Sequence, residues 1–382
     1  MRILHVGFSL GAQEPERLLE AWPTLTGVAA ALARAGNDVT VLQLALRTGT
    51  LQRDHVTYQF VSEGHPGFRT LPGGRRFPRR PSRLLRLAAS LAPDVAHIHG
   101  LGFPMQTRYL ARALPRTPLV AQDHANRPPE GWRRVLHRWG LRALSGVLFT
   151  AREQAQPFIQ TGTLRKTIPV FEALEGSTGF TPGNRMRARA ATGLRGDPCL
   201  VWLGRLDENK DPLTVLEALS IAAPRLRDPH LWCCFRSAPL LETVRERIRA
   251  RPALAGRVHL LGERRHGEIE PLLRAADFLV QGSRFEGSGY AVIEALACGT
   301  VPLVTDIPSL RRITQGGTVG ALSPPGDAGA MSRALCQWSR GDRELQRRRA
   351  REHFVESLSF EAIAVELEAA YRRVSRPSAL PS

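Results

Sequence analysis

The chain has 382 residues, of which 43% are hydrophobic and 23% charged. A chain of this length usually divides into two domains, and this composition excludes a disordered or fibrous protein. The formal net charge is +18, and only two of the 53 basic residues are lysine. A GC-rich bacterial genome explains this arginine bias most simply, so the charge by itself predicts no nucleic-acid ligand.

Neither a membrane span nor a metal site is indicated by the sequence. Apolar runs stay well short of the ~20 residues that cross a bilayer, and residues 1–10 resemble a buried strand rather than a signal peptide. We therefore expect a cytoplasmic protein. The cysteines have no spacing typical of zinc ligands, and we expect them to be reduced core residues. They are Cys199, Cys233, Cys234, Cys298 and Cys336.

The first half alternates short apolar runs with helical patterns. Runs that are continuously apolar, rather than alternating, predict strands covered on both faces, as in a parallel doubly wound sheet. Residues 26–36 predict a helix that ends at Gly36. The predicted strands are residues 3–8, 38–44, 94–100, 118–124 and 146–151.

The second half repeats this architecture after residues 173–185, which are rich in Gly, Ser, Thr and Pro, as linkers are. Its predicted strands are residues 199–206, 230–235, 258–263, 276–283 and 301–306. We expect two Rossmann-like domains, 1–175 and 176–355, followed by a terminal amphipathic helix within 356–382. Ligands bind such sheets at the carboxyl ends of their strands, so functional residues should follow strands.

The segment from Phe285 to Gly299 is the most informative part of the chain. A Gly/Ser loop follows a strand that is predicted to end at Gly282, and a helix begins near Tyr290. Free N–H groups and the helix dipole at such a turn suit phosphate oxygens, while carboxylates suit sugar hydroxyls. Taken alone, the loop could equally be a helix cap flanked by solvated acids. The candidates are Glu286, Gly287, Ser288, Gly289, Tyr290 and Glu294.

Two cations follow the strand at residues 199–206. Arg205 comes directly after Gly204, and Lys210 precedes the next predicted helix. Cations at a helix start oppose the helix dipole, so a purely structural role is the weaker interpretation. Aimed at a departing diphosphate, they would stabilise its growing negative charge.

In the first half, histidines lie at the predicted carboxyl ends of two strands. We expect His97 to be a core residue, and His124 beside Asp123 to be the better functional candidate. A metal site formed by His97, His99, His124 and Asp123 would match no common ligand spacing. Gly27 is expected to precede a helix, where its backbone could approach a donor phosphate.

Two arginine-rich clusters stand out, residues 69–86 and Trp132–Arg142. In the second, Trp132, Leu136 and Trp139 share one helical face among arginines. This pattern suits peripheral docking on an anionic membrane surface, such as the inner face of the cell membrane. A solvated helix that docks by its aromatic face is the alternative.

Residues 204–219 and 283–306 together resemble the C-terminal domain of glycosyltransferase family 4, a retaining family with the GT-B fold. Its paired glutamates, with seven residues between them, are matched by Glu286 and Glu294, and its Arg/Lys pair by Arg205 and Lys210. The resemblance implies an α/β GT-B fold, with two doubly wound domains facing a cleft and a terminal helix packing back toward the first. The N-terminal, acceptor-binding domain resembles the family less closely, since Thr26 stands where members often have glycine.

The resemblance also implies roles. Glu286 and His124 would contact the donor sugar, and Glu294 the ribose. Arg205 and Lys210 would contact the diphosphate, and residues 287–290 the edge between sugar and phosphate. The nucleobase would lie near Leu261 and Gly262. The donor is then a UDP- or GDP-sugar used as co-substrate without a cofactor or bound metal, and the acceptor is an unidentified glycan, lipid or small metabolite.

The function predicted from these features is transfer of a hexose-type sugar with retention. Two alternatives remain: a GT-B-fold nucleotide-sugar epimerase and a non-catalytic nucleotide-sugar-binding relative. A phosphorylase of the glycogen type would need a Schiff-base lysine, and only Lys166 and Lys210 are available. The intact pairs Glu286/Glu294 and Arg205/Lys210 argue against a relative that has lost its chemistry.

Overall fold

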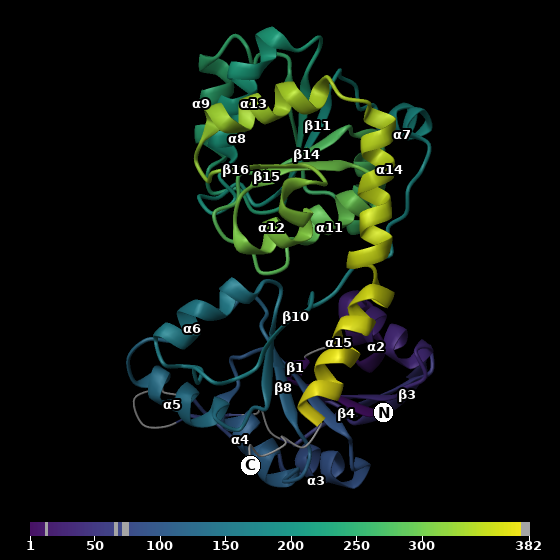
Figure 1. Ribbon diagram of the computed structural model, residues 1–382, viewed down its shortest axis with the longest axis vertical. Helices are drawn as coiled ribbons and strands as arrows, with labels where there is room; N and C mark the ends of the chain where they lie inside the picture. The colour runs from purple at the N-terminus through teal and green to yellow at the C-terminus, as the bar shows by residue number, and fades with distance from the viewer. Residues whose placement is uncertain (12–13, 65–67, 71–75, 376–382) are drawn as a thin grey trace, which may run out of the picture. The chain divides into compact units, whose positions relative to one another are not determined.

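A computed structural model describes residues 1–11, 14–64, 68–70 and 76–375 of the chain. Residues 71–75, within the first arginine-rich cluster, lie outside the described residues. The chain folds as two compact units: unit 1 comprises Met1–Gly176 with Phe360–Ser382, and unit 2 comprises Ser177–Ser359. Both are α/β units built on a parallel sheet with helices around it (Figure 1).

Unit 1 contains an eight-stranded sheet in the order β10-β9-β8-β7-β1-β2-β4-β3, in which only β3 runs antiparallel to its neighbour. Its central strands are buried apolar runs, as the sequence predicts. The strands are β1 (Arg2–Gly11), β2 (Asp38–Ala45), β3 (Gly49–Arg53), β4 (Val56–Val61), β7 (Val95–His99), β8 (Leu119–Gln122), β9 (Gly146–Phe149) and β10 (Val170–Glu172), with a separate hairpin of β5 (Phe68–Thr70) and β6 (Arg76–Pro78). The helices are α1 (Pro15–Ala21), α2 (Pro23–Arg34), α3 (Ser82–Leu91), α4 (Pro104–Ala113), α5 (Gly131–Leu141), η1 (Arg152–Ala155), α6 (Gln156–Gln160) and α15 (Phe360–Ser375).

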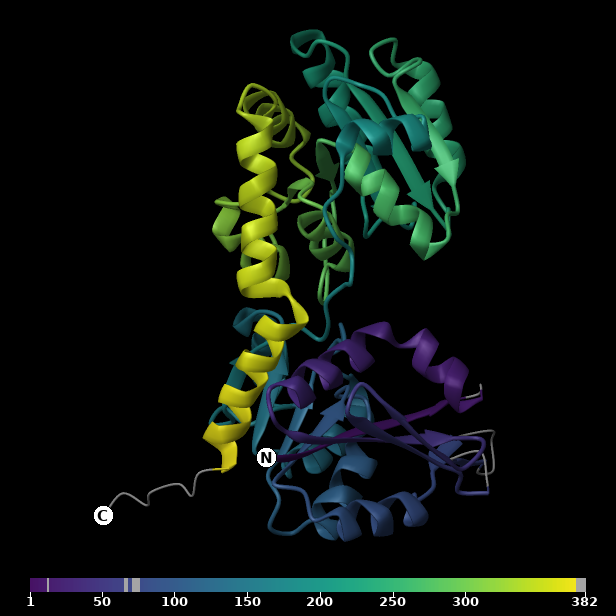
Figure 2. The same cartoon turned by 90° about the vertical axis from the view of Figure 1, so that its right-hand side faces the viewer.

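The terminal helix α15 belongs to unit 1, where it packs on α2 (Figure 2). It begins at Phe360, because residues Phe354–Leu358 form a separate π-helical turn. Gly27 lies at this contact: a Cβ added to it would come within 2.4 Å of the Phe360 ring. The expectation that Gly27 precedes the helix is wrong, since it is the fifth residue of α2 and its N–H falls within the helical hydrogen-bond ladder. Close helix packing explains the glycine.

Unit 2 contains a six-stranded, fully parallel sheet in the order β13-β12-β11-β14-β15-β16. Its strands are β11 (Cys199–Gly204), β12 (His230–Phe235), β13 (Val258–Gly262), β14 (Phe278–Val280), β15 (Val301–Thr305) and β16 (Ala321–Ser323). Its helices are α7 (Arg185–Thr192), α8 (Pro212–Ala222), η2 (Ala223–Arg225), α9 (Leu241–Ala250), α10 (His266–Ala275), α11 (Tyr290–Ala297), α12 (Pro308–Ile313), η3 (Gln315–Gly317), α13 (Ala328–Ser339) and α14 (Arg343–His353). The strand predicted to end at Gly282 ends earlier, at Val280.

The order of strands in unit 2 reverses between β11 and β14. In an open parallel sheet, the loops that leave the carboxyl ends of strands diverge at such a reversal and open a crevice for a ligand. The loops after β11 and β14 are those that carry the residues singled out in the sequence. All five cysteines are buried and free, as expected.

Candidate functional site

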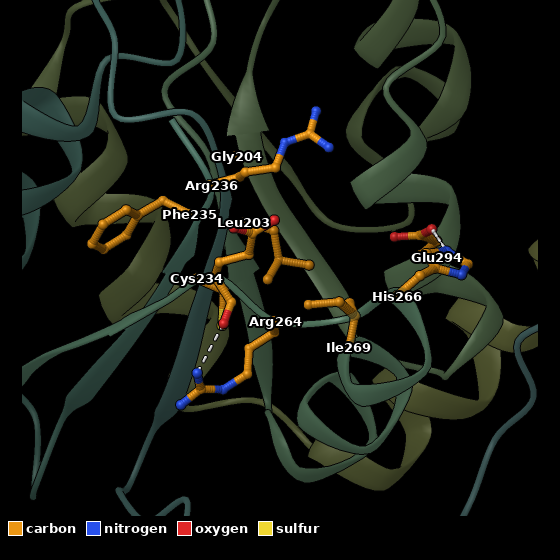
Figure 3. Close-up of a pocket in the computed structure, with 10 residues that line it drawn as sticks. Leu203, Gly204, Cys234, Phe235, Arg236, Arg264, His266, Ile269 and Glu294 are labelled. Carbon is orange, nitrogen blue, oxygen red and sulfur yellow. Dashed lines mark hydrogen bonds and ion pairs between the residues drawn. The ribbon is translucent and has the colours of Figure 1, made fainter. Parts of the chain in front are cut away.

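A pocket of about 300 Å³ opens at the carboxyl ends of β11, β12 and β13 in unit 2 (Figure 3). Its size lies at the lower end of the range for small-ligand sites. The walls come from the three strand ends, the start of α10 and one residue of α11. They are Leu203, Gly204, Cys234, Phe235, Arg236, Glu263, Arg264, His266, Ile269 and Glu294. Both apolar surface and charges of either sign therefore face this pocket.

Glu294 projects into this pocket from α11 (Figure 3). Its side chain is only 13% exposed, and its Oε1 accepts a hydrogen bond of 2.8 Å from His266 Nε2. The interpretation of Glu294 as a solvated helix residue is therefore wrong. A carboxylate held in a pocket can still accept hydrogen bonds from a pair of neighbouring hydroxyls, since it offers about four lone-pair sites.

The loop after β14 is fastened to the loop after β11. Lys210 and Glu286 form an ion pair in which the side chains are 18% and 12% exposed. Asn209 Nδ2 donates to the Phe285 carbonyl at 3.0 Å, and Ser309 Oγ donates to the Glu286 carbonyl at 3.0 Å. The structure thus brings together Lys210 and Glu286, which lie far apart in the sequence.

Gly289 closes this loop as the N-cap of α11, with a φ of 61°. This left-handed conformation favours glycine, and an added Cβ would also lie 2.8 Å from Leu310. No side chain caps α11 at this residue. Ser288 is 4% exposed and Tyr290 is the first helical residue, so residues 287–290 form the predicted turn into the helix.

Gly204 and Arg205 differ in their surroundings. Gly204 lines the pocket, and a Cβ there would lie 3.4 Å from the Lys210 side chain, which therefore runs alongside it. Arg205 is 60% exposed, pairs with Asp207 at 2.7 Å and does not line the pocket. Its contact with a diphosphate stays a prediction.

The predicted nucleobase position falls beside the pocket rather than on its wall. Leu261 and Gly262 end β13, and the two residues that follow them, Glu263 and Arg264, line the pocket. Sequence reasoning also missed Arg236 and His266. The sequence could have pointed to both residues, because Arg236 directly follows β12 and His266 begins the helix after β13. Both positions follow the carboxyl end of a strand.

His124 lies in unit 1, on the wall of a second pocket of about 370 Å³. This pocket also takes residues from the ends of β1 and β7, including His99 and Phe103. His124 Nδ1 donates to Glu175 Oε2 at 2.6 Å, and the Glu175 side chain is 10% exposed. Burial raises the pKa of the neighbouring Asp123 to about 6. His124 thus has a carboxylate partner that the sequence did not reveal.

Beneath this pocket, His5, His97 and His99 stack in the core, with His97 and His99 ring centroids 4.6 Å apart. His97 is a core residue, as expected, and its Nδ1 lies 2.6 Å from the Tyr371 hydroxyl. Burial lowers the pKa of all three histidines, to about 4 for His5. In the described part of the chain, no His, Cys, Asp and Glu cluster could hold a metal ion.

Solved structures share this architecture. Anabaena HepE in complex with UDP superposes with a TM-score of 0.66 at 18% identity, covering 98% of this chain and 100% of that one. A glycosyltransferase from Rickettsia africae gives a TM-score of 0.69 at 15% identity, covering 99% and 100%. At these identities the likeness shows the fold, which is the α/β GT-B fold predicted from the sequence.

The sequence comparisons give the family. The model for "Glycosyl transferases group 1" matches residues 197–340, and the model for "Glycosyltransferase Family 4" matches residues 24–170. Because the two models recognise the two halves of the chain, this chain belongs to glycosyltransferase family 4, and membership implies retention. It is a glycosyltransferase that uses a nucleotide-diphosphate sugar, as predicted.

Two curated relatives are mannosyltransferases. The chain is 26% identical to a GDP-mannose:cellobiosyl-diphosphopolyprenol alpha-mannosyltransferase of Xanthomonas campestris, over 68% of this chain and 66% of the relative. It is 27% identical to a phosphatidyl-myo-inositol mannosyltransferase of Mycobacterium leprae, over 69% of each. The alignments thus span about two thirds of these relatives' lengths.

Proposed function

We propose that this chain transfers a hexose, with retention, from a UDP- or GDP-sugar whose nucleotide occupies the unit 2 pocket. The observation that carries the proposal is Glu294, a carboxylate held inside a pocket at the strand-order reversal. Ribose presents two adjacent hydroxyls, and this carboxylate can accept hydrogen bonds from both. The apolar side chains of Leu203 and Ile269 offer the base a surface to pack on.

The reaction breaks the bond between the sugar and the diphosphate, and negative charge grows on the leaving group. Gly204 lines the pocket and the Lys210 side chain runs alongside it, so we propose that the Lys210 ammonium group stabilises that charge. Glu286 would accept hydrogen bonds from the sugar, and the N–H groups at the start of α11 would face the phosphate edge. Arg205 would swing from Asp207 to the diphosphate.

A retaining transfer without a protein nucleophile can proceed by front-side attack, in which the acceptor hydroxyl approaches the face that the diphosphate leaves. The departing phosphate oxygen then accepts the acceptor's proton. We also propose that His124, which pairs with Glu175, contacts the donor sugar, and no residue needs to act as a separate base. The chain's own contribution is positioning and charge stabilisation.

Nucleotide binding can be tested directly by thermal unfolding of the purified chain with UDP and with GDP. A ligand that binds only the folded state raises the Tm, by a free energy equal to RT ln(1 + [L]/Kd). We expect one of the two nucleotides to raise the Tm and the other to do so less. Failure of both to shift the Tm at millimolar concentration would refute the donor site.

We further propose that α5 brings the chain to an anionic membrane carrying a lipid-linked acceptor. On this helix Trp132 and Val135 are each 68% exposed, and Trp139 is 37% exposed. Leu136, assigned to the apolar face by its spacing, is less exposed than Val135. Trp132 and Val135 are thus open to a partner, whereas Trp139 is partly covered and its ring centroid lies 5.6 Å from the Arg108 guanidinium carbon. Exposed aromatic side chains among arginines suit an interfacial helix.

The names of both mannosyltransferase relatives include a lipid-linked acceptor, which supports a lipid acceptor here. Among the described residues, no helix is both long and apolar enough to span a bilayer.

The proposed membrane contact predicts that vesicle binding weakens when Trp132 is replaced. Sedimentation with vesicles containing anionic lipid should recover the wild-type chain, and Trp132→Ala should lower the partition constant about tenfold, since one buried indole is removed. Met186→Ala is the matched control, because Met186 is 70% exposed but lies in unit 2. Equal sedimentation of wild type and Trp132→Ala would exclude α5 as the contact.

A further inference from the structure

His266 is the least expected member of the unit 2 pocket. It is the first residue of α10, and its ring packs on Phe180, with centroids 4.8 Å apart. Its Nε2 lies 2.8 Å from Glu294 Oε1, as the dashed line in Figure 3 shows. The imidazole is thus held between an aromatic ring and a carboxylate, while 65% of it remains exposed.

The contact with His266 restrains the carboxylate with which Glu294 would bind a ligand. The imidazole N–H occupies one lone pair of Oε1 and restrains the carboxylate, which has about four lone-pair sites in all with which to accept hydrogen bonds. A restrained carboxylate loses less rotational freedom when it binds a ligand, so its hydrogen bonds contribute more to affinity. If Glu294 could rotate freely, this gain in ligand affinity would be lost.

We propose that His266 is a positioning residue of the donor site, which orients Glu294 toward the ribose hydroxyls and makes nucleotide affinity depend on pH. This inference rests on the proposed function, because it concerns the same pocket. His266 acts on the nucleotide through Glu294, and through its own charge when it is protonated.

Several charged groups surround the imidazole. The hydrogen bond that His266 donates to Glu294 raises the pKa of His266 above its usual value. Partial burial opposes this, while the charges of Glu294 and Glu270 add to it. The pocket also contains Glu263, Arg236 and Arg264. Histidine is the side chain that ordinarily changes charge near neutral pH, and His266 is the histidine among the residues that line this pocket.

The direction of the pH effect follows from the protonation states. Below its raised pKa, His266 is a cation whose Nε2 always carries a proton, so the contact to Glu294 is charge-assisted and the pocket is more positive toward a diphosphate. Above that pKa the imidazole is neutral, and only one of its two tautomers donates to Glu294. Affinity for a nucleoside diphosphate should therefore fall as the pH rises through the pKa of His266.

The test is calorimetric titration of the full chain with UDP and with GDP between about pH 6 and pH 8.5, which brackets histidine titration. His266→Asn keeps a neutral donor, and His266→Ala keeps none. Between the lowest and the highest pH, the Kd of the wild-type chain should rise roughly tenfold more than the Kd of the His266 variants. A tenfold change corresponds to the loss of one charge-assisted hydrogen bond. His266→Asn should lose most of this dependence, and His266→Ala should also bind more weakly at the low end.

His55→Asn is the matched control, because His55 is exposed in unit 1 and has a φ of 62°, which asparagine tolerates. It should follow the wild-type pH dependence. Because the nucleotide's own ionisation affects all variants alike, the comparison between variants isolates His266. If His266→Asn kept the wild-type pH dependence, the inference would be overturned while the donor site stood. If the wild-type chain bound neither nucleotide, the donor site itself would be refuted.

Discussion

Replacing Lys210 with alanine is expected to lower kcat by about 100- to 1,000-fold, the loss typical of removing one preorganised charge from a leaving group. Its side chain is only 18% exposed, so its charge is poorly screened by water. The nucleotide should still bind, although more weakly, because the largest benefit of the ammonium group comes as the bond to the sugar breaks. Steady-state kinetics at saturating donor would measure this loss.

The chain supplies its own control for Lys210. Lys166 is the other lysine, and it is exposed in unit 1, so Lys166→Ala should leave kcat unchanged. Because Lys210 pairs with Glu286, removing it can lower the stability of the chain, so the Tm of Lys210→Ala is measured too. The kinetics are then compared at a temperature well below that Tm. A folded Lys210→Ala chain with wild-type kcat would show that the leaving group is stabilised elsewhere.

Replacing Glu294 with alanine is expected to raise the Kd for UDP or GDP by about 100-fold, since two hydrogen bonds to a charged group are lost. The pocket geometry supports a large effect, because Glu294 is 13% exposed and directed at the ligand space. The Kd of Glu294→Gln should fall between those of the wild type and Glu294→Ala, since an amide oxygen still accepts a hydrogen bond. Isothermal titration with the nucleotide would give these values.

Glu246→Ala serves as the control for Glu294, because Glu246 is an exposed acid on α9 in the same unit. It should bind the nucleotide as the wild type does. Wild-type affinity in Glu294→Ala would mean that the ribose lies elsewhere, and the pocket would then need another occupant.

The architecture was readable from the sequence because its strands are covered on both faces. Cys199–Gly204 and Val301–Thr305 are buried throughout or nearly so, and such strands appear as continuous apolar runs. The order of the strands in the sheet could not be predicted from the sequence. The rule that ligands bind at the carboxyl ends of strands nevertheless singled out Gly204 and Glu294, which line the same pocket.

Other features depend on contacts between distant segments, which spacing cannot reveal. His266 and Glu294 are 28 residues apart and meet only because α10 and α11 pack together. Gly27 resembled a loop glycine, but its role is set by Phe360, more than 300 residues later. On α5, spacing grouped Leu136 with Trp132 and Trp139 on one face, but it did not show that Val135 is 68% exposed there.

The most direct test of the central claim is to incubate the wild-type chain with a panel of UDP- and GDP-hexoses and lipid-linked acceptors, and to measure both nucleotide release and the anomeric configuration of the product. We predict release of one nucleoside diphosphate and a product with the donor's configuration, with Lys210→Ala at least about 100-fold slower. Nucleotide binding without release from any donor, or a product of inverted configuration, would contradict the account.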